Sequence, residues 1–573
     1  GEEIGLLIKV SDNLKAIGID TRIVSVPCYQ NFIDDYNENI IHLHETKHSY
    51  LRAQPRKPEH GKYGIPTKTP FANLVGQIKV DLPSNRSGVK QTKETAIYPI
   101  LEVTNASKIY YNYPTLHRGA YDSTRFYYSL QPFTIDSLDN FNDIAFRMKG
   151  KLVSAGIFPD LAEDLRIMPD YSLGFSTTAP ATGLDFYGTG AKYANKILLS
   201  NNGLQGAGTI NFEHSTSISK ELFTFLPDST LGLVSFVNKS IEKGIEFPSV
   251  KSDNAYMVYV PKNKIMRVYS TAKNDLDFFE QEAKLRGVTF VQPTGMTGKG
   301  LMTFNTASVV SDKFVYKNKD ILADTSSFSL SNSYREDGES ELAFETRNVQ
   351  TNVSFNDRKG VFTSNSGTSE VKFPINQYIC KMDQFTWFMD KEEIELEKEK
   401  DKDMTVDTGV DLVGPNFFSI HPKQDSLRFR APVALFNMKE KTIFCNRVEY
   451  LDIADARIYP DSSRVVVRKK AKIDEFTNAT IVANYITKYH KFERATVNVT
   501  ARRAYTASGE YPYYSKDSIP TYIVMQNIKP DSACVTRAEG VVEKERSFQL
   551  NDYFDYYGKL KVVASSPEIF FDG

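Results

Sequence analysis

The sequence predicts a mainly β protein, built of tandem β-sandwich or β-solenoid-like modules with few helices. The first observation is alternation: in ATVNVTARRAY, Ala495, Val497 and Val499 alternate with polar residues, which is typical of half-buried strands. The second is composition, because 37 Phe and 32 Tyr accompany a single Trp and these rings favour pleated surfaces. The third is that clusters of turn-forming residues such as PDSSR and TASGEYP separate the expected strands. The strand–turn units recur about every 10–12 residues, as in sandwiches, barrels and solenoids.

Length and charge narrow the classes of function. The 573 residues suffice for about three to five domains. Because 70 basic residues balance 71 acidic ones, we expect no nucleic-acid partner, which would need a concentrated positive face. No apolar run approaches the ~18 residues that span a bilayer, so no transmembrane helix is expected. The chain starts with Gly and shows no signal-peptide pattern, and we expect a processed chain or a piece of a longer one.

The N-terminal region, 1–80, is expected to hold strands, a helix within FIDDYNENIIHLHETKHSYL and a basic loop. The loop, RAQPRKPEHGKYGIPTKTP (52–70), is rich in Pro and Gly, which mark irregular connections. A β module is expected over 81–190.

Two glycine-rich decapeptides predict an internal repeat over 191–282 and 283–375. GLQGAGTINF begins at Gly203 and GMTGKGLMTF at Gly295, 92 residues later. The same offset pairs identical residues on both sides of the decapeptides, such as Ala191 with Ala283 and Phe212 with Phe304. A repeat of this size indicates one supersecondary unit used twice, whose copies cover each other's apolar faces.

The glycines are interpreted as structural. They are Gly203, Gly206, Gly208, Gly295, Gly298 and Gly300. A dinucleotide loop needs Gly-x-Gly-x-x-Gly followed by a helix, whereas these motifs read Gly-x-x-Gly-x-Gly and lead into β-branched residues. Glycine also permits bulges and close strand approach, so we expect no bound nucleotide and no other cofactor.

The remaining segments complete the expected order. NDLDFFEQEAKLRG (274–287) is expected to form a short helix between Asn274 and Gly287. C-terminal β modules are expected over 376–573, with KEEIELEKEKDKDM (391–404) as a helix or a charged, solvated hairpin tip.

One constellation matches a metal site. In HETKH, His44 and His48 would share one face of a helix and ligate zinc, with Glu45 as general base. This resembles the zincin peptidase motif over five residues. Lys47 beside a ligand and the Pro-rich loop that follows favour surface histidines, so the zinc peptidase is kept as an alternative and the main interpretation is non-enzymatic.

Six Asp-Ser dipeptides raise a modification hypothesis. Their serines are Ser123, Ser137, Ser229, Ser426, Ser518 and Ser532. The pattern is similar to the O-glycosylation sites of extracytoplasmic Bacteroidota proteins, and it is also ordinary turn chemistry. The four cysteines, Cys28, Cys380, Cys445 and Cys534, form no CxxC pair, and free buried thiols are expected.

Several phrases resemble those of very large envelope proteins of Bacteroidota: DSLDNFNDIAFRMKGKLVSAGIFP, DYSLGFST, FPINQYICKMDQFTWFMDKEEIEL and YTASGEYPYY. The alternation in KFVYKNKDILADTSSFSL and TIFCNRVEYLDIADARIYPD is similar to that of OstA-type lipopolysaccharide-bridge and AsmA/TamB-like β-solenoid proteins. The resemblance covers 130–573. It implies an extracytoplasmic location, in the periplasm or at the cell surface, and β-solenoid or jelly-roll troughs.

The function expected from these observations is a non-enzymatic scaffold, fibre or adhesin-like component of a larger envelope assembly. Its partners would be other protein chains or further copies of itself. A conduit for lipid or glycolipid between membranes is the second hypothesis, and the zinc peptidase is the third.

Overall fold

The structure is a computed structural model that describes residues 50–51, 69–72, 76–79, 100–111, 116–135, 146–169, 173–365, 369–397, 415–514, 520–546 and 548–572. The expected mainly β class is confirmed in these residues. Helical structure in them is limited to 3-10 turns: η3 (Leu116–Gly119), η4 (Pro261–Asn263), η5 (Phe279–Gln281), η6 (Pro422–Gln424), η7 (Lys469–Ala471) and η8 (Lys544–Arg546).

The chain forms two compact units, residues 1–280 with 288–296 and residues 281–287 with 297–573. The strands of the first unit are β1 (Tyr50–Leu51), β2 (Thr69–Ala72), β3 (Gly76–Lys79), β4 (Ile100–Val103), β5 (Ser107–Ile109), β6 (Phe126–Leu130), β7 (Phe133–Ile135), β8 (Gly150–Ser154), β9 (Arg166–Ile167), β10 (Leu173–Phe186), β11 (Ala191–Ser200), β12 (Gly203–Phe212), β13 (Ser215–Ser219), β14 (Phe223–Leu226), β15 (Ser229–Asn238), β16 (Val250–Val260), β17 (Ile265–Tyr269) and β18 (Leu276–Phe278). Two strands contribute residues to both units, β19 (Ala283–Gln292) and β20 (Gly295–Phe304).

The second unit holds the later strands. They are β21 (Ala307–Tyr316), β22 (Asp320–Ser331), β23 (Leu342–Ser354), β24 (Lys359–Ser364), β25 (Glu370–Phe373), β26 (Tyr378–Lys381), β27 (Gln384–Phe388), β28 (Glu393–Glu397), β29 (Phe417–Ser419), β30 (Arg428–Phe429), β31 (Val433–Asn437), β32 (Thr442–Asn446), β33 (Leu451–Ile453), β34 (Ala456–Tyr459), β35 (Arg464–Val467), β36 (Phe476–Ala483), β37 (His490–Ala501), β38 (Ala504–Tyr514), β39 (Pro520–Pro530), β40 (Thr536–Val542), β41 (Gln549–Asn551), β42 (Phe554–Asp555), β43 (Gly558–Val563) and β44 (Ile569–Asp572).

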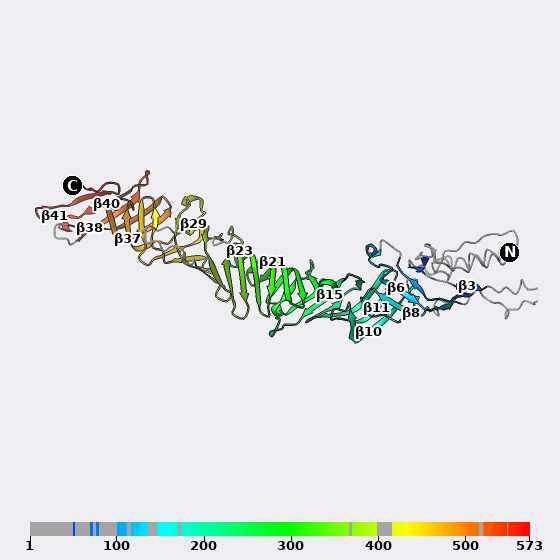
Figure 1. The fold of residues 1–573 in the computed structure, drawn as a ribbon. Helices are drawn as coiled ribbons and strands as arrows, with labels where there is room; N and C mark the ends of the chain where they lie inside the picture. The colour runs from blue at the N-terminus through cyan, green and yellow to red at the C-terminus, as the bar shows by residue number, and fades with distance from the viewer. Residues whose placement is uncertain are drawn as a thin grey trace, which may run out of the picture. The chain divides into compact units, whose positions relative to one another are not determined.

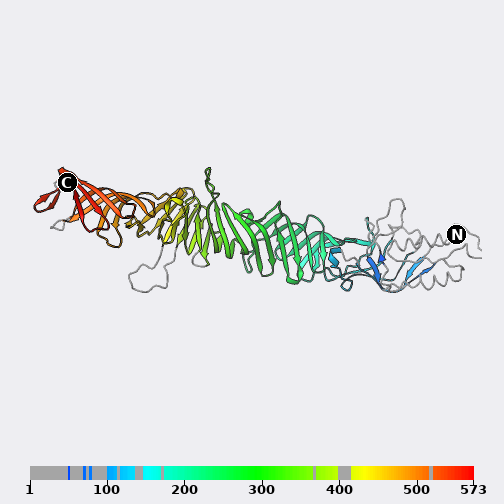
Figure 2. The same cartoon turned by 90° about the horizontal axis from the view of Figure 1, so that it is seen from above.

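The first strands form two small sheets, with the orders β1-β2-β5-β6-β8 and β3-β4-β7. From β10 onward, most strands of each unit lie beside strands that are close to them in chain order (Figures 1 and 2). Neighbours pair antiparallel, as β10 does with β11 and β22 with β23. Where a strand is interrupted, its two halves share their neighbours: β13 and β14 both lie between β12 and β15. Short turns suffice for this meander, because antiparallel neighbours need no crossover.

Bends near the middle of the long strands curl the sheet into a half-barrel. The strand register shifts between Ala179 and Leu184 in β10, and again between Val234 and Phe236 in β15. In β23, Asn348 adopts a positive φ of 57°, a conformation that asparagine tolerates better than most residues. Such bulges bend a strand and increase its twist.

Aromatic side chains fill the inside of the curl in the first unit. Phe186 on β10 stacks on Tyr259 on β16, with ring centroids 5.9 Å apart, although β11 to β15 separate these strands in the sheet. Tyr193 and Phe225 lie 5.0 Å apart beside them. These rings are buried, so they meet across the curl and form its core.

The second unit is filled in the same way. Phe304 on β20 lies 5.7 Å from Trp387 on β27, and Phe362 stacks on Phe385 at 4.7 Å. The Trp387 side chain is 1% exposed. Burial of large rings is the main favourable term in such a core, at roughly 25 cal/mol per Å² of apolar surface.

The offset that relates the two glycine decapeptides also relates strand bounds. Five pairs of strands start 92 residues apart: β10 and β17, β11 and β19, β12 and β20, β13 and β21, and β16 and β23. β12 and β20 also end 92 residues apart, at Phe212 and Phe304.

Within the second unit, the last part of the chain forms its own nine-stranded antiparallel sheet. The strand order is β33, β34, β36, β37, β38, β39, β40, β43 and β44. The sheet therefore ends at β33 on one side and at β44 on the other, with a two-stranded ribbon of β41 and β42 beside it.

The helix expected over 274–287 is wrong. Leu276 and Phe278 are buried on β18, whereas Asp277 between them is half-exposed, and β18 pairs with β16. Phe279, Glu280 and Gln281 all have positive φ, which a right-handed helix excludes. Gly287, expected as the helix stop, lies inside β19. The alternating burial of its side chains and its pairing with β16 make this part of the segment a strand, although the residues at the two ends of the segment resemble helix caps.

The charged segment 391–404 starts as a strand rather than a helix. In β28, buried Ile394 and Leu396 alternate with more exposed glutamates, and the strand pairs with β27 and β31. The rest of this segment, from residue 398, lies outside the described residues. So do most of the helix and the basic loop expected between residues 32 and 70.

Candidate functional site

All six glycines of the decapeptides lie in strands, three on β12 and three on β20. A Cβ on Gly208 would lie 2.0 Å from the carbonyl oxygen of Ala194, and a Cβ on Gly300 would lie 2.3 Å from that of Arg286. Both contacts are shorter than any tolerated contact of a Cβ atom, so both positions require glycine. The two glycines and the two carbonyls are each 92 residues apart, and each strand approaches its neighbour in the same way.

The HETKH segment, with His44, Glu45 and His48, lies outside the described residues. Within the described ranges, no three His, Cys, Asp or Glu side chains gather closely enough to hold a metal ion. His490 is 2% exposed and accepts a hydrogen bond from Tyr511 at Nδ1 while its Nε2–H donates to the Ser566 carbonyl. Burial lowers the pKa of His490, so this imidazole is a neutral structural link between β37 and the turn after β43.

The Asp-Ser serines lie at turns where the structure describes them. Ser123, Ser426 and Ser532 are exposed and Ser229 is half-buried, whereas Ser137 and Ser518 fall outside the described residues. Asp122 accepts a hydrogen bond from the backbone N–H of Thr124, and Asp531 accepts one from that of Ala533. These are Asx turns, so turn chemistry accounts for the aspartates.

The described cysteines are free thiols. Cys380 and Cys445 are completely buried, and burial raises the pKa of both thiols well above the usual value. A buried neutral thiol is a poor nucleophile. Cys534 is half-buried, in the turn before β40.

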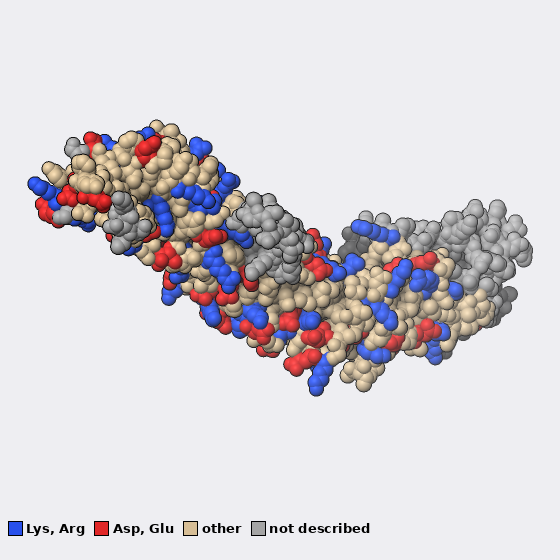
Figure 3. All heavy atoms as spheres, turned by 60° about the vertical axis from the view of Figure 1, so that its left-hand side comes forward, with Lys and Arg blue, Asp and Glu red and all other residues tan. Residues whose placement is uncertain are grey.

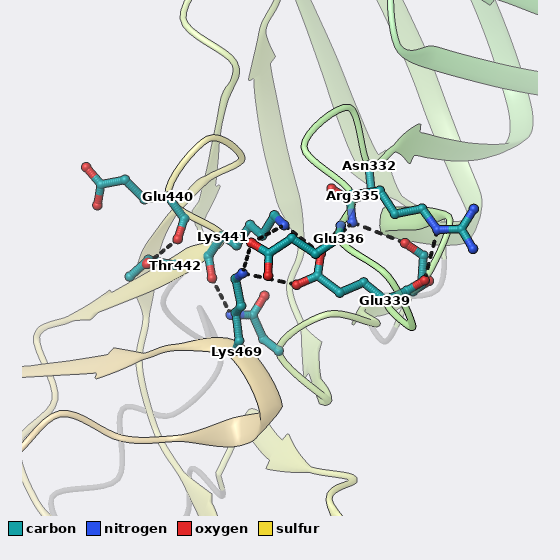
Figure 4. A network of polar contacts seen from close by, with 10 residues as sticks. Asn332, Arg335, Glu336, Glu339, Glu440, Lys441, Thr442 and Lys469 are labelled. Atoms are coloured by element: carbon teal, nitrogen blue, oxygen red, sulfur yellow. Dashed lines mark hydrogen bonds and ion pairs between the residues drawn. The ribbon is translucent and has the colours of Figure 1, made fainter.

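An ion-pair cluster lies in the second unit (Figure 4). Lys441, 3% exposed, contacts Glu339 at 2.5 Å and Glu336 at 3.5 Å. Lys469 contacts Glu336 at 2.6 Å and Glu339 at 3.1 Å. The cluster joins the turn between β22 and β23 to the turn before β32 and to η7.

The pKa values in this cluster keep its side chains charged, as expected for a structural ion pair. Burial alone would raise the pKa of Glu339, but hydrogen bonds from Lys441, the Glu336 backbone, Lys469 and Asn332 lower it to about 2. Hydrogen bonds to Glu336 and Glu339 raise the pKa of Lys469 to about 12. General acid–base catalysis needs pKa values near the working pH, and both groups are shifted away from it.

A cleft of about 400 Å³ also lies in the second unit, and we call it the arginine cleft. Its lining comes from β30, from the turns on either side of β33, and from the turns that follow β36, β37 and β39. The arginines in its wall are Arg428, Arg430, Arg447, Arg502 and Arg503, and the carboxylates are Glu449 and Asp452. These arginines were not predicted from the sequence, although the RFR and ARR groups at strand ends were an available signal.

One carboxylate of the arginine cleft is already paired. Arg457 donates two hydrogen bonds to Asp452, at 2.8 Å and 3.0 Å, and its guanidinium lies 3.7 Å from the ring centre of Tyr450. Such bidentate pairs are strong and fixed in geometry. Arg503 pairs with Asp425 at 3.2 Å, with both side chains largely exposed.

Exposed aromatic side chains lie on the edge strand β44 and on or next to the short strand β42. Tyr553 is 87% exposed and Phe554 is 63% exposed, beside and on β42, and Phe570 on β44 is 49% exposed. Phe571 points to the opposite face of β44 from Phe570 and contacts the rings of Tyr513 and Tyr556, which fixes the strand. We call the exposed rings with strand β44 the aromatic edge; β38, β40 and β41 in Figure 1 mark this part of the chain.

Elsewhere the surface is mixed in charge. Lys and Arg are interspersed with Asp and Glu over the face drawn in Figure 3. Among the described residues, none of the helices has the length and apolar character needed to cross a lipid bilayer.

Comparisons with known proteins give no match: no family model, no curated protein and no solved structure matches this chain.

Proposed function

We propose that this chain is a non-enzymatic scaffold, fibre or adhesin-like component of a bacterial envelope assembly, located outside the cytoplasm. The observation that carries the proposal is the aromatic edge, where rings that are 49% to 87% exposed lie on or near the last strand of a sheet. An open edge strand offers unpaired backbone groups to another chain. Exposed aromatic side chains are the residues most enriched at protein interfaces.

The repeated strand spacing supports a scaffold. Five strand starts recur after 92 residues, and the Gly208 and Gly300 contacts recur with them. We infer from this that the chain duplicates one antiparallel unit. Duplicated units whose neighbours cover each other's apolar faces are a common way to build structural proteins.

The filled curl favours the scaffold over the lipid conduit. Phe186, Tyr259 and Phe304 are at most 3% exposed, so protein side chains occupy the space that an acyl chain would need. A conduit requires a continuous apolar lining that is open to its cargo.

The proposed role in assembly is tested by measuring self-association of the purified chain. The triple variant Tyr553→Asp/Phe554→Asp/Phe570→Asp places charges on the aromatic edge, where all three side chains already contact solvent. We expect sedimentation velocity to show concentration-dependent association of the wild type, reduced at least about tenfold in the variant, because buried unpaired charges oppose docking. Ile486→Asp is the matched control, since Ile486 is 78% exposed in the turn between β36 and β37 and is not a residue of the aromatic edge.

Two results would contradict this proposal. The first is a wild-type chain that neither self-associates nor is crosslinked to envelope proteins through a photoreactive residue at position 570. The second is unaltered association of the triple variant. Cell fractionation with protease accessibility tests the location, and a protein found wholly in the cytoplasm would refute it.

A further inference from the structure

The arginine cleft concentrates positive charge in a chain that is otherwise balanced. Five guanidinium groups line about 400 Å³ with two carboxylates, one of which is held by Arg457 outside the lining. The whole chain, by contrast, has 70 basic and 71 acidic residues. Such local excess focuses the electrostatic potential and attracts anions.

Three of these arginines have no partner within the described part of the chain. Arg428, Arg447 and Arg502 make no ion pair and no side-chain hydrogen bond there, although each contributes to the wall of the cleft. They come from separate segments: β30, the turn after β32, and the turn between β37 and β38. Like charges that converge from separate segments repel one another, and none of these three arginines has an ion-pair partner in the described residues to offset that repulsion.

The shape and chemistry of the cleft define a class of ligand. Arginine presents a planar fork of donors that matches the oxygens of a phosphate or sulfate group. Tyr485, with 37% of its surface exposed, adds an aromatic ring to the wall, and aromatic rings provide flat apolar surfaces for ligands. We propose that the arginine cleft binds a sugar that carries a phosphate or sulfate ester.

This binding site is separate from the aromatic edge and from the assembly function proposed above. The residues that line the cleft fall between Pro415 and Cys534, and no residue of the aromatic edge belongs to the lining. The two proposals therefore fail independently.

Calorimetric titration of the full chain at low ionic strength tests the site. The probes are glucose 6-phosphate, glucosamine 6-sulfate and uncharged glucose. We expect saturable binding of one or both esters and none of glucose, and the tighter ester identifies the source of the ligand. The variant Arg447→Gln/Arg502→Gln is expected to weaken that binding at least about tenfold, because charge-assisted hydrogen bonds are lost.

Arg464→Gln is the matched control. Arg464 lies on β35 with its guanidinium 4.5 Å from the ring centre of Phe444, and it does not line the cleft, so this variant should bind as the wild type does. Without ligand, Arg447→Gln/Arg502→Gln should unfold at the same temperature as the wild type or at a higher one, because repulsion is removed. The proposal is overturned if glucose binds as well as the esters, if neither ester saturates, if the double variant binds unchanged, or if its unfolding temperature falls by several degrees.

Discussion

At the residue scale, Gly208 and Gly300 show how much of the local structure the order of glycines in the sequence predicts. The order of glycines and the β-branched residues after them predict a backbone role, and both Gly208 and Gly300 indeed lie in strands. The sequence does not give the partner of each close approach, Ala194 or Arg286, because register across strands depends on bulges that no local pattern specifies.

Replacing Gly208 by Ala should destabilise the fold. The new Cβ would lie 2.0 Å from the Ala194 carbonyl oxygen and 2.9 Å from the Tyr193 hydroxyl, so β11 and β12 must separate. We expect a loss of roughly 1–3 kcal/mol, measured by urea unfolding. Gln205→Ala, at a half-buried position of the same strand, is the control and should change stability by less than about 1 kcal/mol. Equal effects of the two substitutions would show that the glycine is not required.

Glu339 should make stability depend on acid pH. Its folded pKa of about 2 lies below the usual 4.5, so its contribution is complete above pH 4.5 and is lost as the pH falls toward 2. Glu339→Gln should therefore be less stable than the wild type at pH 7, on the order of 3 kcal/mol because Lys441 loses its closest partner. The difference should shrink in urea unfolding below pH 4.5.

A double variant separates the contribution of the Glu339–Lys441 ion pair from other effects of the Glu339 substitution. In Lys441→Met/Glu339→Gln neither buried charge remains, and the stability at pH 7 should recover most of what Glu339→Gln alone removes. A double variant as unstable as the single one would mean that Glu339 acts through other contacts.

At the element scale, period-two alternation predicts strands well. Cap-like residues at the two ends of a segment predict helices less well. The alternation over 495–500 lies in β37, whereas the helix expected over 274–287 is replaced by β18, η5 and β19. That segment has helix-like ends, but Leu276 and Phe278 bury against the sheet and three successive residues with positive φ form the turn. Tertiary burial therefore outweighs local helix preference there.

The link between β37 and the turn after β43 should be sensitive to mild acid. Because the folded pKa of His490 is lowered by burial, the unfolded chain binds the proton more tightly, and stability falls as the pH drops below about 6.5. His490→Phe should remove this slope between pH 7.5 and pH 5 in thermal unfolding, whatever its effect on absolute stability. The half-buried His421 serves as control, and His421→Phe should keep the slope. A slope that survives in His490→Phe would assign it to other groups.

At the scale of the whole molecule, the sequence predicts the β class and a repeated spacing, but not the arginine cleft. Arg428, Arg447 and Arg502 stand far apart in the chain and meet only because of how the strands of the second unit pack. The alternation that defines strands is also compatible with a hollow trough. Only the ring contacts across the curl, such as Phe304 with Trp387, distinguish a filled interior.

A filled interior predicts that the purified chain carries no lipid. Mass spectrometry of organic extracts should find no more lipid than in an equal amount of a control protein purified identically, because rings such as Phe328 and Phe344 are completely buried. Lipid in a fixed molar ratio to the chain would favour the conduit instead.

The most direct measurement is an experimental density map of the full chain at side-chain resolution. We expect this map to show rings packed across both curls and the same close contact twice, Gly208 on Ala194 and Gly300 on Arg286. A map with an open groove that holds elongated density, or with the two glycine strands in dissimilar surroundings, would contradict the account of a filled, duplicated scaffold.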